Sequence, residues 1–487
     1  MKKVLSRLIP LLLAAMLIIT ACAPQADTPP AAQPTPQPPD VSTPATAPPP
    51  ADDLDDLLTE PVTLRMQSWA LGTEEENNWL RQLIKAFEED HPGVTVEIVS
   101  VPPDEDYDGY LMVQAAERNL PDVFMRWSAA DTVTKGWAMD VTRYAEADPD
   151  YMAVVPSLRD SGKYNNRVFA IPNGMFIFGF VQNHTLMEDI NVEPLPYNYT
   201  MDDLIAKIAE CTTDKYRGTD NFEISEWGPF VLAPEKNIGF GTFDGNRFNY
   251  ASPEFAEAIA IWRNLGTRGM TANTWLFPDD SWNHDGWAFG DGVIALQFDG
   301  SWSANFVANE ASWNGDFIPL PGGKMAIVPD YMFVGANTEH AELAYRLLAY
   351  ISYSTPGTLR RLDIHKADGT LYQGFPLNPG HIREADDFIR ESLASMPGLF
   401  QMYLDVGSNP NASIVEAAKF VPGYMKARFN DGDTGLTDAE GNRMGIGGLI
   451  NAIIQGERNL ADYAQEMEDL ANRYYEEAIA EMMEFIS

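Results

Sequence analysis

Cysteine is almost absent from this sequence of 487 residues, which contains only Cys22 and Cys211. No intrachain disulfide can form once Cys22 is chemically modified. The chain must then be held together by core burial, which is feasible because more than four hundred residues follow the first sixty. Cys211 follows Ile205 and Ile208 on an apparent helix, so we expect it to pack in the core.

Histidine is also scarce, and no two histidines are spaced to hold a metal. The six stand at positions 91, 184, 284, 340, 365 and 381, without a His-x-x-x-His or His-Glu-x-x-His pattern. The nucleophile-elbow, Walker and dinucleotide-binding glycine patterns are absent as well. The sequence therefore predicts no catalytic metal and no cofactor. An acidic turn with Asp431, Asp433 and Asp438 partly resembles a calcium loop, but Gly435 stands at the third ligand position, so calcium and a solvated turn remain alternatives.

Positive charge is in short supply. The chain has 33 Lys and Arg against 71 Asp and Glu, a formal net charge of −38. Such a surface repels phosphate backbones, so nucleic acid is excluded as a partner, and the acidity is expected to serve solubility. Two carboxylates at the right separation suffice for sugar hydrolysis, so a surface-anchored carbohydrate enzyme remains an alternative.

A long hydrophobic run is missing too. The longest, from Leu8 to Ile19, is too short to be a lasting membrane anchor, but it follows Lys2, Lys3 and Arg7 in the order typical of a signal peptide. The four residues ending at Cys22 resemble a bacterial lipobox. That resemblance implies a signal peptide over residues 1–21 and a lipid on Cys22, which becomes the mature N-terminus.

Residues 22–60 are predicted to be a tether. Residues 23–50 contain eleven prolines and no aromatic, Lys or Arg residue, so nothing is available to pack and polyproline II conformation is favoured. At ~3.1 Å per residue, such a segment reaches up to roughly 90 Å. The tether would hold the folded body near the membrane surface.

Alternating strands and helices begin after the tether. Val62, Leu64 and Met66 alternate with polar residues, and Thr73 with Glu76 predicts a capping box at the start of a helix. Further strands and helices alternate along the chain: helices at 79–87, 107–117, 200–208, 252–265, 338–351 and 460–482, and strands at 94–98, 121–125 and 293–298. The pattern predicts an α/β fold, and its length predicts two lobes.

Several tryptophans follow predicted strands. Trp69, Trp127 and Trp302 each stand just after a strand, and open α/β sheets bind ligands at the carboxyl ends of their strands. Aromatic rings with a few planar polar groups suit the apolar faces and hydroxyl rims of sugars. These three are therefore candidate ligand contacts, whereas Trp79 and Trp262 lie on helix faces and are assigned to the core.

A series of short motifs resembles one family. These are Leu120 to Phe124, Gly136 to Thr142, Gly162 to Tyr164 with Val168 to Pro172, Asn183 to Leu186, Phe289 to Gly292, Gly300 to Trp302, and Ile318 to Gly322. Each motif is weak alone, but their order and spacing resemble the extracellular solute-binding proteins of bacterial ABC importers, in the sugar-binding group that includes maltose-binding protein. Residues 405–448, an acidic insertion, depart from the family's pattern.

The resemblance implies a two-lobe fold of the periplasmic-binding-protein type, with a hinge between the lobes. The N-terminal lobe would comprise residues 61–175 plus 318–365, and the C-terminal lobe 176–317 plus 366–487. The implied ligand contacts are Trp69, Trp127 and Asp131 from the first lobe, Trp227, Asp299, Ser301 and Trp302 from the second, and Tyr331 just past the second crossing. The context of Asp131, Arg126-Trp127-Ser128, departs from the usual pattern.

The function implied is capture of a mono- or oligosaccharide and its delivery to an ABC transporter permease. The protein would act without covalent chemistry, as a monomer, anchored through its lipid and facing the outside or the periplasm. The acidic composition keeps open a second ligand class on the same fold, a polyamine, a peptide or another cation.

Overall fold

The structure is a computed structural model, and it describes residues 60–73, 76–101, 106–220, 224–232, 240–272, 275–277, 282–372, 374–409 and 412–486. The signal peptide, Cys22 and the tether up to residue 59 lie outside the described residues. No described helix combines the length and the apolar character that a membrane span requires.

The described part of the chain begins with strand β1 (Val62–Gln67), a short 3-10 helix (Trp69–Leu71), helix α1 (Trp79–Asp90) and strand β2 (Val94–Ile98), and β1 pairs with β2 in parallel. This confirms the predicted strand-helix-strand unit. The capping box is wrong: Asn78 is the N-cap of α1, and its side chain accepts a hydrogen bond from the backbone N–H of Arg81. The Thr73 hydroxyl instead donates to the Glu76 carboxylate at 3.3 Å.

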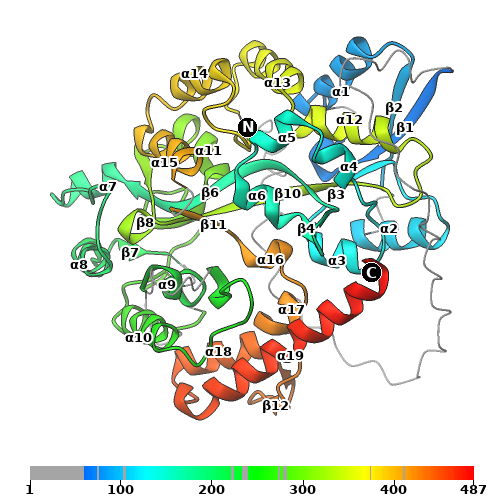
Figure 1. Cartoon of the computed structure of the whole chain (residues 1–487). Coiled ribbons are helices and arrows are strands. Elements are labelled where there is room, and N and C mark those ends of the chain that lie inside the picture. The colour runs from blue at the N-terminus through cyan, green and yellow to red at the C-terminus, as the bar shows by residue number, and fades with distance from the viewer. Residues whose placement is uncertain are drawn as a thin grey trace, which may run out of the picture. The chain divides into compact units, whose positions relative to one another are not determined.

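One mixed sheet of nine strands organises the molecule (Figure 1). Its order is β2, β1, β3, β10, β6, β8, β7, with β11 beside β10 and β9 beside β6. The added strands are β3 (Val123–Arg126), β6 (Ile171–Asn183), β7 (Arg217–Thr219), β8 (Ile294–Gly300), β9 (Gly315–Ile318), β10 (Met325–Val334) and β11 (Ser413–Val415). Helices flank this sheet, which confirms the α/β class.

Two long strands, β6 and β10, connect two halves of the sheet. The end of β10, residues 331–334, pairs with β3, whereas its start, residues 325–327, pairs with β11. Similarly, residues 178–182 of β6 pair with β8. We call the β2-β1-β3 side the N-terminal half and the β8-β7 side the C-terminal half.

The C-terminal half has its own apolar core. Helices α8 (Met201–Cys211), α10 (Pro253–Thr267) and α18 (Ile446–Gln455) bury their apolar faces in it. Cys211 and Trp262 are both buried there, as predicted, and burial raises the pKa of the Cys211 thiol to about 11. Trp79, assigned to the core from its helix face, is only partly buried against the core of the other half.

The last helix, α19 (Leu460–Ile486), joins two cores. Met467 and Leu470 pack in the core of the C-terminal half, whereas Met482 and Ile486 pack in a smaller cluster with Phe124. Helix α3 (Ala129–Thr134) contributes to the same small cluster, and Figure 1 shows the end of α19 beside it. One continuous helix therefore contacts elements of both halves.

The remaining elements complete the layers around the sheet. The predicted helix start at Thr338 is wrong by three residues, because α12 begins at Ala341 after His340. The other helices and short strands are α2 (Tyr107–Ala116), α4 (Thr142–Ala145), α5 (Pro149–Ala153), α6 (Pro156–Ser161), β4 (Lys163–Tyr164), β5 (Arg167–Val168), α7 (His184–Asp189), α9 (Ile224–Leu232), α11 (Ala304–Asn309), α12 (Ala341–Ser352), α13 (Thr355–Asp368), α14 (Arg383–Ser392), α15 (Pro397–Ser408), α16 (Ala417–Phe420), α17 (Tyr424–Arg428), β12 (Leu436–Thr437) and β13 (Arg443–Met444).

Candidate ligand-binding site

The carboxyl ends of β3 and β8 point toward each other along the crossing strand β6. Arg126, at the end of β3, is level with Tyr331 of β10 and so with Pro172 of β6, whereas Gly300, at the end of β8, is level with Phe178. Strand β3 runs in the direction of β6, and β8 runs against it. At about 3.3 Å per residue, roughly 20 Å of β6 separates the two ends. The segments that follow β3 and β8 therefore extend toward each other along β6.

Aromatic rings gather where β8 ends. Trp302 lies in a short 3-10 helix (Ser301–Ser303) directly after β8 and is only half-buried. The centre of its ring is 5.0 Å from the ring centre of Phe178 and 5.7 Å from that of Phe176, and both pairs meet edge-on. Phe176 and Phe178 lie on β6 and are half-buried. Phe178 also stacks on Phe298 at 5.2 Å. The rings form a partly exposed apolar surface around the predicted contact Trp302.

Asp299 and Ser301 support that turn. The Asp299 carboxylate accepts hydrogen bonds from the Gly300 N–H at 2.7 Å and from the Ser303 hydroxyl. Burial outweighs these bonds and raises the pKa of Asp299 to about 6. Ser301 is buried and its hydroxyl oxygen accepts from the Ile177 N–H at 3.1 Å, which fixes the turn to β6.

Two exposed tryptophans stand at the carboxyl ends of the strands in the N-terminal half. Trp69 is 43% exposed and lies edge-on to Tyr107 at 5.6 Å, and Trp127 is 41% exposed. Because β1 and β3 are parallel neighbours, the two residues extend from the same edge of the sheet. The Lys419 ammonium lies 5.2 Å from the centre of the Trp127 ring.

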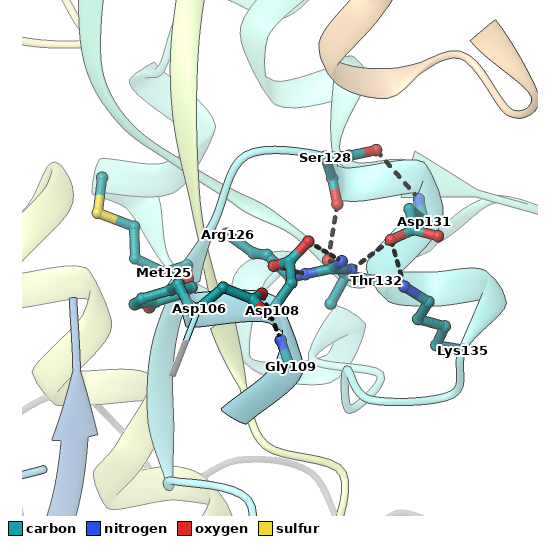
Figure 2. A network of polar contacts seen from close by, with 10 residues as sticks. Asp106, Asp108, Gly109, Met125, Arg126, Ser128, Asp131, Thr132 and Lys135 are labelled. Atoms are coloured by element: carbon teal, nitrogen blue, oxygen red, sulfur yellow. Dashed lines mark hydrogen bonds and ion pairs between the residues drawn. The ribbon is translucent and has the colours of Figure 1, made fainter. Parts of the chain in front are cut away.

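Asp131 belongs to a charged network centred on Arg126 (Figure 2). The Arg126 guanidinium donates two bonds to Asp108, at 2.9 and 2.7 Å, and lies 2.6 Å from an Asp131 oxygen, which Lys135 also approaches at 2.8 Å. Burial opposes ionisation of Asp108, but Arg126 holds its pKa below the ordinary value. The network fixes the turn that carries Trp127, and Asp131 keeps a partly exposed carboxylate.

Two of the predicted contacts lie in the interior instead. Trp227 is 0% exposed in α9, where its ring packs against Phe180 and Phe298 in the core. Tyr331 is also 0% exposed, and its hydroxyl is 2.6 Å from that of Ser161. Neither side chain presents a surface to a ligand, so both are corrected to packing residues. Their apolar neighbours in the sequence did not distinguish a buried ring from a ligand platform.

Five further residues of this region were not predicted from the sequence. Phe176 and Phe178 alternate on a strand that reads as continuously apolar, so their half-exposure carries no local signal. Asp330 did carry one, because it is the single charged residue of β10. Asn173 and Lys419 reach the region only through the tertiary fold.

A separate cavity of about 390 Å³ lies between α19 and the turn around Asn246. Its lining is polar and includes Arg247, Asn472 and Tyr475, but none of the predicted contacts. Elsewhere in the described ranges, no group of three or more His, Cys, Asp and Glu side chains is arranged to hold a metal ion.

Comparisons with known proteins agree with this arrangement. The family model described as bacterial extracellular solute-binding protein matches residues 82–364. A search of curated protein sequences found no match.

Similar solved structures share the fold. An ABC substrate-binding protein from Listeria monocytogenes in complex with cycloalternan has a TM-score of 0.60 at 17% identity, covering 84% of this chain and 98% of that one. A cyclic alpha-maltosyl-1,6-maltose binding protein from Arthrobacter globiformis has 0.60 at 16%, covering 86% and 100%. A Thermotoga lettingae solute-binding protein bound with alpha-D-tagatose has 0.57 at 16%, also covering 86% and 100%. These likenesses confirm the periplasmic-binding-protein type of fold, and the family match shows that this chain belongs to the bacterial extracellular solute-binding proteins.

Proposed function

We propose that this protein captures a carbohydrate between the two halves of its sheet and delivers it to an ABC transporter permease. The observation that carries the proposal is the pair of opposed strand ends, each followed by a tryptophan with an accessible ring, Trp127 and Trp302. Partly exposed rings on segments that extend toward each other suit the apolar faces of a sugar. Similar structures hold cycloalternan and tagatose, which favours the same ligand class here.

Each proposed contact has a role that follows from its surroundings. Trp302 stacks on the ligand from the C-terminal half, while Trp127 and Trp69 contribute rings from the other side. Asp131 and Asp299 accept hydrogen bonds from ligand hydroxyls, since the Asp131 side chain is 42% exposed and Asp299 is a partly exposed residue. Ser301 holds the Trp302 turn in place rather than meeting the ligand.

The proposal includes closure of two lobes, 61–175 plus 318–365 and 176–317 plus 366–487. Both crossing strands are irregular where they pass between the halves. Gly174 of β6 has a φ of +75°, which favours glycine, and the register of β10 shifts between Pro329 and Asp330. Such positions can absorb the backbone rotation that hinge closure requires.

The N-terminus completes the proposal. A lipid on Cys22 and the proline-rich tether would keep a monomeric binding body at high effective concentration near the permease, on the outer or periplasmic side of the membrane. Retention at the membrane would then raise the rate at which the ligand-bound protein meets its transporter.

A calorimetric screen of mono- and oligosaccharides tests the ligand class. We expect one sugar to bind with micromolar or tighter affinity, and Trp302→Ala to weaken it at least 100-fold because the stacking surface is lost. Trp287→Ala is the matched control, since Trp287 is 58% exposed and is not a proposed contact. The proposal fails if no sugar binds, or if both variants bind like the unaltered protein.

A cationic solute is the second candidate, supported by two carboxylates at one edge of the C-terminal half. Asp220 follows β7 and Asp299 lies in the parallel neighbour β8. Burial, the largest cause, and the charge of Asp299 both raise the pKa of Asp220. A bound cation would stabilise both anions. Tight binding of a polyamine or basic peptide, with no response to sugars, would replace the carbohydrate proposal by this one.

A further inference from the structure

One charged pair lies where the two halves of the sheet meet. Asp330, in β10, follows the shift in register against β6, and its carboxylate is 3.0 Å from the Lys419 ammonium. The Lys419 side chain is 7% exposed and that of Asp330 is 21% exposed. The pair is thus largely shielded from water, but the Asp330 side chain remains partly accessible.

Lys419 is held in place by its own element. It belongs to α16, whose Phe420 carbonyl accepts a hydrogen bond from the Tyr164 hydroxyl at 2.8 Å. The same ammonium that pairs with Asp330 lies 5.2 Å from the Trp127 ring centre. An ammonium has three N–H donors, and a carboxylate can accept on both oxygens. Within the described part of the chain, Asp330 is the one hydrogen-bond acceptor that contacts this ammonium. The Lys419 ammonium can therefore donate further hydrogen bonds, and the Asp330 carboxylate can accept further ones.

Asn173 adds an independent observation. It is the cross-strand partner of Asp330, and such partners place their side chains close together on one face of the sheet. Asn173 is 6% exposed, and its side-chain carbonyl oxygen is buried with no hydrogen-bond partner among the described residues. A buried oxygen in this state is unfavourable unless a ligand or water donates to it.

We propose that Lys419, Asp330 and Asn173 recognise hydroxyl groups of the ligand beside the Trp127 ring. A sugar hydroxyl donates one hydrogen bond and accepts others, so it can take a bond from Lys419 and give one to Asp330 or Asn173. The inference rests on the proposed carbohydrate function and deepens it by naming the specificity-determining group.

The position of Lys419 in the sequence makes this recognition particular to the chain. Lys419 lies in residues 405–448, the segment that departs from the family's pattern, whereas Asp330 and Asn173 lie on the strands that cross between the halves. A binding site built to hydrogen-bond a hydroxyl strongly rejects an analogue that lacks it, because the polar groups of the site are then left unpaired. The three residues would therefore set which sugars the protein accepts.

Calorimetry with the best sugar from the screen and its monodeoxy analogues tests the inference. We expect Lys419→Met and Asp330→Asn each to weaken binding of the sugar at least tenfold. Lys426→Met is the matched control, because Lys426 is exposed on the neighbouring helix α17, and it should bind like the unaltered protein. Thermal unfolding of each variant confirms that the measured protein is folded.

The deoxy analogues separate recognition from a merely structural role. At least one analogue should bind the unaltered protein tenfold or more weakly than the parent sugar, yet Lys419→Met should bind that analogue and the parent sugar alike. Equal losses for every analogue in Lys419→Met would show that Lys419 only maintains the fold and would overturn the inference. Unchanged affinity in both variants would overturn it while leaving the carbohydrate function intact, whereas absence of any sugar binding by the unaltered protein would overturn both.

Discussion

At the scale of a single residue, Asp299 links the candidate site to pH. Its pKa is raised from 3.8 to about 6, chiefly by burial, despite hydrogen bonds from Ser303 and Gly300. An acid whose pKa is higher in the folded state than in the unfolded state favours folding at low pH. This contribution is fully present below pH 3.8 and is lost as the pH rises through about 6.

The variant Asp299→Asn should therefore gain stability relative to the unaltered protein as the pH rises. A pKa shift of about two units corresponds to about 3 kcal/mol. The difference in unfolding free energy between the variant and the unaltered protein should therefore change by at most about 3 kcal/mol between pH 4 and pH 7.5. Urea unfolding of both proteins at the two pH values measures it. A stability difference that is the same at both pH values would contradict the assignment.

At the scale of an element, the final two turns of α19 make its contact with the small cluster that contains α3 and Phe124. Met482 is buried beside α3, and its truncation to alanine leaves a cavity, so we expect Met482→Ala to lower the unfolding free energy by about 2–5 kcal/mol. Urea unfolding gives the loss, and hydrogen exchange should show faster exchange of α3 amides. Glu484→Ala, on the exposed side of the same turn, is the control and should leave both unchanged. Equal behaviour of the two variants would show that α3 does not depend on this contact.

Elements were predictable where one periodicity dominated the local sequence. The two-residue alternation of Val62 to Met66 and the helix expected from residue 200 were sufficient, because neighbouring side chains decide these structures. Helix α8 indeed begins after Thr200, whose side chain forms a capping box with Asp203. Thr73 misled because its pairing with Glu76 occurs without a helix, which begins only after Asn78.

The candidate site was only partly predictable for a different reason. Trp302 follows a strand, and that order in the sequence places it at the correct edge. Burial of Trp227, however, is decided by rings from distant elements, Phe180 and Phe298. Lys419 meets Asp330 across 89 positions of sequence, and no local pattern encodes such an encounter.

At the scale of the whole molecule, we expect the proposed lipid anchor and the proposed binding body to act independently. We expect Cys22→Ser to move the protein from the membrane fraction to the soluble fraction outside the cytoplasm, because export is retained while lipid attachment is lost. Sugar affinity should not change, since the tether carries no proposed ligand contact. Cell fractionation with calorimetry on both proteins measures the two effects, and continued membrane association of the variant would contradict the lipid assignment.

The position of β10 in the sheet has a consequence for how the chain folds during its synthesis. Strand β10 lies between β3 and β6, yet β3 ends at Arg126 and β6 at Asn183, long before Met325 is synthesised. A ribosome that makes the chain from its N-terminus thus releases the two strands that flank β10 before β10 itself exists. Until Val334 has emerged, β3 and β6 each expose an edge of unpaired backbone groups, the kind of surface that aggregates. The nascent chain therefore carries these unpaired strand edges from the synthesis of β3 until that of β10 is complete, and its sheet closes only late.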